Sequence, residues 1–238
     1  MRPFTCIIAI TLTLSVTGIS AQYKLDARQL KLDPYAWLDQ QNDQQNSGIV
    51  NGEYYEIKRI SKHSHQFFGD DSWVLGEIIF RNQLFDSVYL TYDIHSDLLL
   101  IRHPTQYIYH NQPIKPVQEQ ISSFQILEHQ FIRIDEQKLN GFYDLLFSGQ
   151  NLRLVVKRHK QTYVENSVEF EPDNRYYLHK DGNYLPLKRK SSILKIFPGN
   201  KKDIKTFINR NRLDIRPGND SDYIRIIDYL DSQIGNSL

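Results

Sequence analysis

Apolar and polar residues alternate with a period of two through most of the stretch from Gly52 to Lys180. Alternation of this kind places successive side chains on opposite faces of a β-strand. Because the segments are short, rich in Val, Ile, Tyr, Phe and Leu, and separated by few residues, they predict an antiparallel sheet. The segments are residues 53–60, 73–81, 85–92, 98–103, 106–110, 131–135, 142–148, 152–158, 163–170 and 175–180. We therefore expect an antiparallel β barrel or sandwich.

After Pro186 the spacing of apolar residues changes to that of a helix. Residues 190–197, 200–213 and 221–235 each carry a narrow apolar stripe, which predicts three helices that lie on other elements. The fold class is then mainly β (α+β), an antiparallel β barrel or sandwich followed by a small C-terminal helical segment. The expected parts are a signal peptide (1–21), a polar N-terminal extension (22–48), an antiparallel β domain (49–187) and a helical segment that packs on it (188–238).

The first 21 residues have the layout of a secretory signal peptide. Arg2 precedes a run of apolar and hydroxyl residues that extends to Ile19. This run is shorter than the roughly 20 apolar residues that a spanning helix needs, so we expect cleavage after Ser20 or Ala21 instead of a membrane anchor. No later run is long and apolar enough to cross a bilayer. We therefore expect the mature chain to be exported without a transmembrane segment.

The single cysteine, Cys6, lies inside this leader, so the mature chain is expected to have no thiol. Disulfides, thiolate catalysis and cysteine-based zinc sites are then excluded together. A secreted chain without disulfides must be stabilised by its core alone, which roughly 215 mature residues can supply. Small secreted eukaryotic modules more often carry cystines. The absence therefore favours a bacterial protein, periplasmic or associated with the outer membrane.

The net charge of +1 conceals an uneven distribution. Residues 22–150 hold 11 Lys and Arg against 17 Asp and Glu, whereas residues 151–216 hold 16 against 7. Lys201, Lys202 and Lys205 surround the apolar stripe of the second predicted helix, and we take them as a candidate basic surface for a partner. An envelope or outer-membrane protein, or peripheral contact with a membrane, would fit this surface, and nucleic acid is not expected in that compartment. The alternative is an ordinary solvated face.

The segment YDIHSDLLLI at residues 92–101 offers two readings. On one strand, Asp93, His95 and Asp97 would project from the same face and form an O/N/O metal site. However, that strand would run for about 18 residues, far beyond the usual five or six. Asp and Ser close turns through their own side chains, so we predict a turn in which both aspartates are structural.

Other candidate chemistry is weaker. His63 and His65 could bind zinc if Asp70 or Asp71 folded over them, but no third ligand has a defined spacing. Motifs for nucleophilic catalysis or nucleotide binding are absent from the sequence. The carboxylates that could serve a glycosidase are Glu165, Glu169 and Glu171, which would share one strand, although alternating Glu is ordinary on a solvent-facing strand. We therefore predict no catalytic, cofactor-binding or metal residues.

Several short motifs follow one another along the chain. The series comprises Val50-Asn51-Gly52-Glu53-Tyr54, Tyr92-Asp93 leading to Asp97, Gly141-Phe142-Tyr143-Asp144, Tyr176-Tyr177-Leu178 and the basic helices after Lys188. The series resembles a family of uncharacterised secreted proteins from Bacteroidota, in which a YNG-x-EY opening, a GFY strand, a YYL strand and a Lys-rich helical end follow in this order. Val50 stands where that opening has Tyr. The resemblance implies export and a β-rich fold, and no catalytic residues.

These observations lead to one expected function and one alternative. The expected function is a secreted, non-enzymatic binding or scaffold protein of the bacterial cell envelope, without cofactors. The alternative is an envelope hydrolase that acts on carbohydrate or peptidoglycan through two carboxylates in a β groove.

Overall fold

The computed structural model describes residues 48–102, 112–136, 138–164 and 167–235, all within one compact unit. The predicted leader, almost all of the polar extension and the predicted strand at residues 106–110 lie outside the described residues.

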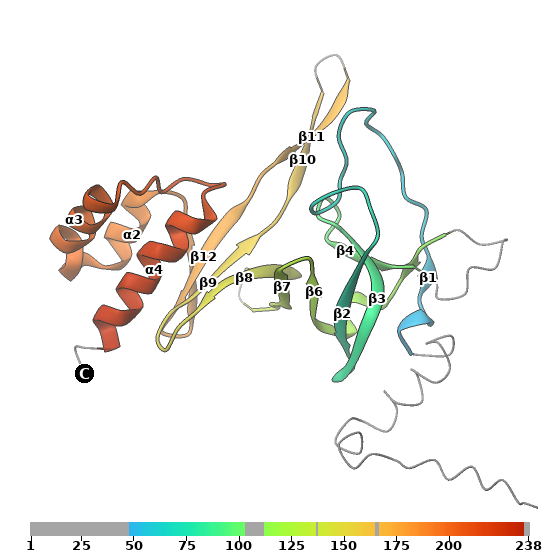
Figure 1. The fold of residues 1–238 in the computed structure, drawn as a ribbon, viewed down its shortest axis with the longest axis horizontal. Helices are drawn as coiled ribbons and strands as arrows, with labels where there is room; N and C mark the ends of the chain where they lie inside the picture. Colours follow the sequence, from blue (N-terminus) through green and yellow to red (C-terminus); the bar gives the residue numbers. More distant parts are fainter. Residues whose placement is uncertain (1–47, 103–111, 137, 165–166, 236–238) are drawn as a thin grey trace, which may run out of the picture. The chain divides into compact units, whose positions relative to one another are not determined.

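Antiparallel pairing dominates the structure, as the alternation predicts (Figure 1). An eleven-stranded sheet has the order β1-β5-β4-β3-β2-β6-β7-β8-β9-β12-β13, and β10 pairs with β11 alone. The strands are β1 (Glu53–Tyr54), β2 (Val74–Phe80), β3 (Gln83–Asp93), β4 (Leu98–Ile101), β5 (Ile114–Lys115), β6 (Ile121–Ile126), β7 (His129–Arg133), β8 (Phe142–Ser148), β9 (Arg153–Lys157), β10 (Lys160–Val164), β11 (Val168–Pro172), β12 (Arg175–Lys180) and β13 (Asn183–Leu187). The predicted mainly β, α+β class is confirmed, but the sheet stays open instead of closing into a barrel.

Two predicted strands differ from the structure. Residues 163–170 do not form one strand, because β10 ends at Val164 and β11 begins at Val168. Asn166 and Ser167 are turn-forming residue types, and the alternation merely continues across them. In the segment 53–60, only β1 pairs with another strand.

The first core is built from aromatic rings on β3, β6, β7 and β8. Tyr92, Phe124, Phe131 and Phe142 are almost fully buried. Phe124 stacks on Phe131 with ring centroids 4.8 Å apart, and the Tyr92 ring meets both of them edge-on. Offset and edge-to-face contacts of this kind add about 0.5–1.5 kcal/mol per pair beyond the burial of area. Tyr92, the second-last residue of β3, is thus buried in this core directly before the turn.

The second core joins the helices to β9, β12 and β13. The helices are α2 (Lys190–Ile196), α3 (Lys201–Asn211) and α4 (Asp220–Gly235), with short 3₁₀ turns at η2 (Gly48–Val50), η3 (Gln118–Gln120) and η4 (Pro198–Asn200). Buried Ile193, Ile204 and Ile226 share one cluster with Val156 and Leu178 of the sheet. The helical segment therefore packs on the β part. Within the described residues, none of the helices has the length and hydropathy to cross a membrane.

Candidate binding surface

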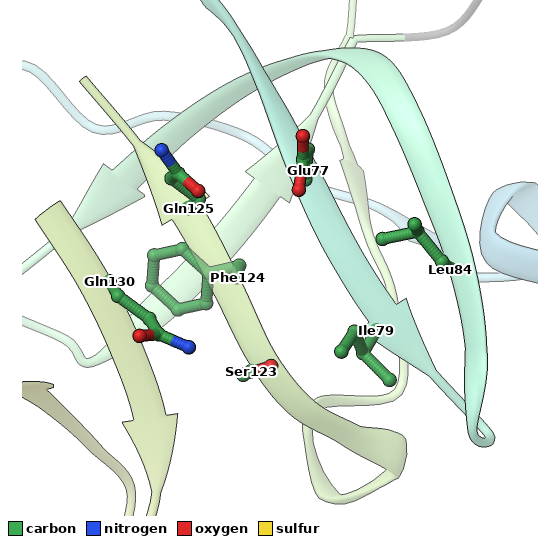
Figure 2. Close-up of a pocket in the computed structure, with 7 residues that line it drawn as sticks. All are labelled: Glu77, Ile79, Leu84, Ser123, Phe124, Gln125 and Gln130. Atoms are coloured by element: carbon green, nitrogen blue, oxygen red, sulfur yellow. The ribbon is translucent and has the colours of Figure 1, made fainter. Parts of the chain in front are cut away.

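A small pocket lies over β2, β3, β6 and β7, and it is lined by Glu77, Ile79, Leu84, Ser123, Phe124, Gln125 and Gln130 (Figure 2). Cross-strand pairing aligns Glu77, Gln125 and Gln130 in one row, and it sets Ile79 beside Leu84 in the next. Its cavity volume of about 60 Å³ is far below the roughly 300–1,000 Å³ of a typical small-molecule site. The pocket can accept a small polar group, but it cannot enclose a sugar ring.

Exposed apolar side chains continue along the same face of β2 and β3. Leu75 pairs directly with Tyr89 across the two strands, and their side chains are 56% and 44% exposed. Leu84 is 46% exposed. Since a soluble surface usually scatters such residues singly, a group of them beside a polar row is typical of a contact face. We call Leu75, Leu84 and Tyr89 the outer sheet patch.

The segment that could have been a metal site is a turn, and this prediction is confirmed. β3 ends at Asp93 and β4 begins at Leu98. The Asp93 carboxylate accepts hydrogen bonds from the backbone N–H groups of His95 (3.0 Å) and Ser96 (2.9 Å), which closes an Asx turn. Burial raises the pKa of Asp93, while these hydrogen bonds act in the opposite direction.

Asp97, at the other end of this turn, is held by side chains of the sheet. Its carboxylate accepts a hydrogen bond from the Tyr92 hydroxyl (2.5 Å) and forms an ion pair with Lys157 (2.6 Å). A Cβ on Gly141 would lie 1.8 Å from this carboxylate, so the Gly of the GFY motif makes room for it. Burial lowers the pKa of Lys157 despite the nearby Asp97, and burial holds the pKa of Tyr92 well above its usual value. The motif residues here perform a structural task.

The zinc site considered for His63 and His65 with Asp70 or Asp71 is not assembled among the described residues. The His65 Nδ1 atom accepts a hydrogen bond from the backbone N–H of Phe67 (3.2 Å), and burial lowers the pKa of this imidazole. Asp71 instead pairs with Arg59. Among the described residues, no cluster of three or more His, Cys, Asp or Glu could hold a metal ion.

The structure describes two of the three glutamates offered for glycoside hydrolysis. Glu165 lies outside the described residues, and Glu169 and Glu171 lie on β11. Glu169 accepts hydrogen bonds from Ser64 (2.7 Å) and Ser61 (3.1 Å) through one oxygen. The hydrogen bond from Ser64 lowers the pKa of Glu169. A general acid needs a raised pKa, so Glu169 is unsuited to that role.

A buried network of charged side chains was not predicted from the sequence. Asp144 on β8 accepts hydrogen bonds from the Arg158 guanidinium (2.6 and 2.8 Å) and contacts His129 Nδ1 at 2.8 Å. Arg158 also pairs with Asp220 (2.6 Å), which accepts a hydrogen bond from the Tyr176 hydroxyl (2.5 Å). The pair of His129 and Asp144 resembles two thirds of a catalytic triad, but no hydroxyl in the described part of the chain hydrogen-bonds to His129. The network joins α4 to the sheet.

The three lysines predicted as a basic surface all lie on α3. At about 100° per residue, Lys201, Lys202 and Lys205 lie within an arc of roughly 100°. All three are exposed, and within the described ranges none of them forms an ion pair, whereas Ile204 and Ile208 of the same helix are buried. We call these three residues the lysine stripe. The stripe lies on one side of α3, and its role as a basic partner surface stays a prediction.

Comparison of the chain with protein-family models, with curated proteins and with solved structures finds no match. Function must therefore be inferred from the surfaces described above.

Proposed function

We propose that this protein is a secreted, non-enzymatic binding or scaffold protein of the bacterial cell envelope, and that the lysine stripe of α3 attaches it to an anionic surface. The observation that carries this proposal is the lack of any ion pair for Lys201, Lys202 or Lys205 within the described residues.

Electrostatics gives the stripe a preference for anionic partners. Each Lys near an anionic membrane surface contributes about 1 kcal/mol, so three adjacent lysines contribute roughly 3 kcal/mol at low salt. The attraction falls off over a Debye length of about 10 Å at 0.1 M salt. Peripheral attachment of this kind is reversible.

The proposed compartment is supported by the sequence. The leader predicted at residues 1–21 directs export, and removal of the leader would remove Cys6, the single cysteine. A chain without thiols forms no disulfides, so its stability does not depend on whether the compartment is oxidising. The resemblance to secreted Bacteroidota proteins supports the same location.

The outer sheet patch supports a scaffold role. Leu75, Leu84 and Tyr89 are exposed on one sheet face, where they could contact a protein partner while the lysine stripe holds an anionic surface. A protein with two separate contact regions can connect a partner to the envelope.

Replacement of Lys201, Lys202 and Lys205 together by alanine is expected to weaken binding of the mature protein to vesicles that contain phosphatidylglycerol by about 100-fold at low salt, because the roughly 3 kcal/mol from three cationic contacts is lost. Co-sedimentation at about 20 mM and about 500 mM salt measures the effect, and the difference from wild type should vanish at the higher salt. Neutral phosphatidylcholine vesicles should bind neither protein.

The matched control is a triple alanine variant at Lys58, Lys62 and Lys138, which are also exposed and carry the same total charge. If both triple variants lost binding equally, net charge would explain capture and the stripe would not. Wild-type affinity of the α3 variant, or an equal affinity of the wild type for neutral vesicles, would contradict the proposal.

A further inference from the structure

The arm formed by β10 and β11 continues the hairpin of β9 and β12. Lys157 pairs with Arg175 in the sheet, and Lys160 pairs with Pro172 in the arm. Both strands advance by three residues between these two pairs, so the register does not change. The backbone N–H of Asp173 bridges the gap by donating to the carbonyl of His159 at 2.8 Å. The arm is thus the end of one long hairpin (Figure 1).

Two hydrogen bonds show which backbone groups of the arm face outward. The N–H of Phe170 on β11 donates to Ser64 Oγ at 2.8 Å, away from β10. Phe170 is paired with Thr162, and in an antiparallel ladder both residues of such a pair turn their N–H and C=O groups outward. The carbonyl of Lys160, two residues before Thr162, accordingly meets His95 Nδ1 at 2.8 Å. The N–H and C=O groups of Thr162 and Val164 therefore face away from β11.

This outward edge also carries exposed apolar side chains. Val164 is 70% exposed and Tyr163 is 50% exposed, and Val164 is more exposed than any other large apolar residue in the described part of the chain. Natural sheets protect an open edge with Lys, Pro or a bulge. Residues 161–164 contain none of these, and Thr, Tyr and Val favour strands. An open, apolar, strand-forming edge is suited to pairing with another strand.

We propose that β10 pairs with β10 of a second copy of this chain, antiparallel, about a two-fold axis at Tyr163. In this register Tyr163 lies opposite its own counterpart at a non-hydrogen-bonded position, where cross-strand aromatic pairs are closest. Thr162 of each copy exchanges two hydrogen bonds with Val164 of the other, which makes four in total. No charged residue lies in the segment 162–164, so the pairing opposes no like charges.

We choose a second copy of the chain as the partner because residues 162–164 are complementary to themselves when paired antiparallel. The same three residues supply both strands, and the carbonyl of Lys160 keeps its hydrogen bond to His95 because it lies outside the paired segment. The contact is far smaller than the roughly 1,200 Å² of a standard interface, so the dimer is weak and forms only at high local concentration.

Sedimentation of the mature chain over a concentration series up to about 1 mM tests the proposal, since small interfaces give weak dimers. The wild type should shift from monomer toward dimer. Thr162→Pro should weaken dimerisation at least 10-fold, because proline removes an N–H that points away from β11 and so leaves the arm paired. Thr162→Val keeps that N–H and should dimerise like the wild type. Unchanged circular dichroism shows that each variant is folded.

A single cysteine placed in the thiol-free mature chain tests the register. Under mild oxidation Tyr163→Cys should form a disulfide-linked dimer, because the axis passes through this position. Gln161→Cys should stay monomeric, because the two copies of residue 161 are offset by four residues. A monomeric wild type at all concentrations, a Thr162→Pro variant that dimerises like the wild type, or cross-linking at residue 161 but not at residue 163 would overturn the proposal.

Discussion

Replacing Arg158 with methionine is expected to lower the free energy of unfolding by about 3–5 kcal/mol, the usual cost of leaving a buried charge without its partner. The Asp144 side chain is 1% exposed, and the Arg158 guanidinium supplies two of its hydrogen bonds. The same change also removes the contact with Asp220 that ties α4 to the sheet. Because domains are stable by only about 5–15 kcal/mol, the loss should be plain in urea unfolding.

The control for this prediction is Arg175→Met. Arg175 also pairs with an aspartate, Asp173, but its side chain is 60% exposed. Exposed pairs contribute about 0–1 kcal/mol, so the midpoint of urea unfolding should barely move. Adding Asp144→Leu to Arg158→Met should recover part of the lost stability, because the buried charge is then gone. Equal effects of the Arg175 and Arg158 single variants would contradict the account.

Replacing Asp231 with alanine is expected to destabilise the fold by about 2–4 kcal/mol, since three N–H groups lose a charged acceptor. The Asp231 carboxylate on α4 accepts hydrogen bonds from the backbone of Gln150 (2.9 Å), Asn151 (2.8 Å) and Leu152 (2.7 Å). A Cβ on Gly149 would lie 2.2 Å from the same carboxylate. The side chain of Asp231 thus accepts hydrogen bonds from three backbone N–H groups in the turn between β8 and β9.

Asp228→Ala is the matched control for Asp231→Ala. Asp228 lies on the same helix but is exposed, and a surface change of this kind stays within about 0.5 kcal/mol. Thermal unfolding of the two variants measures the difference. An Asp231 variant as stable as the Asp228 variant would show that the turn needs no support from α4.

Local patterns predicted much of this fold because they depend on neighbours in sequence. The alternation predicted β3, and the excess length of the uninterrupted segment predicted the turn after Asp93. Spacings of three and four predicted α2, α3 and α4 to within three residues. Side-chain hydrogen bonds within two or three residues, such as that of Asp93 with Ser96, are accessible to the same reasoning.

Contacts between distant residues were beyond these patterns. Arg158 and Asp220 are 62 residues apart, so nothing local marks them as partners. The strand β6 was missed because Ser122 and Ser123 interrupt its apolar alternation, and β13 was missed because Pro186 is unusual in a strand. Pro186 is tolerated because β13 is an edge strand. Whether the sheet closes depends on pairing between strands far apart in the chain.

The candidate binding surfaces were predictable to different degrees. The lysine stripe follows from the sequence of α3, because exposure on an amphipathic helix follows from its period. The outer sheet patch and the open edge of β10 do not, since both depend on which strand lies next to which. The sequence predicted one strand at residues 163–170, where the structure has the two strands β10 and β11. The open edge of β10 was therefore not predicted.

The location of the native chain in fractionated bacterial cells, followed by mass spectrometry, tests the proposed function most directly. The account predicts that the protein is found in the envelope fraction, begins at Ala21 or Gln22, and is released from membranes by high salt because its attachment is electrostatic. Recovery of the full-length chain from the cytosol, with its leader and Cys6 retained, would contradict it.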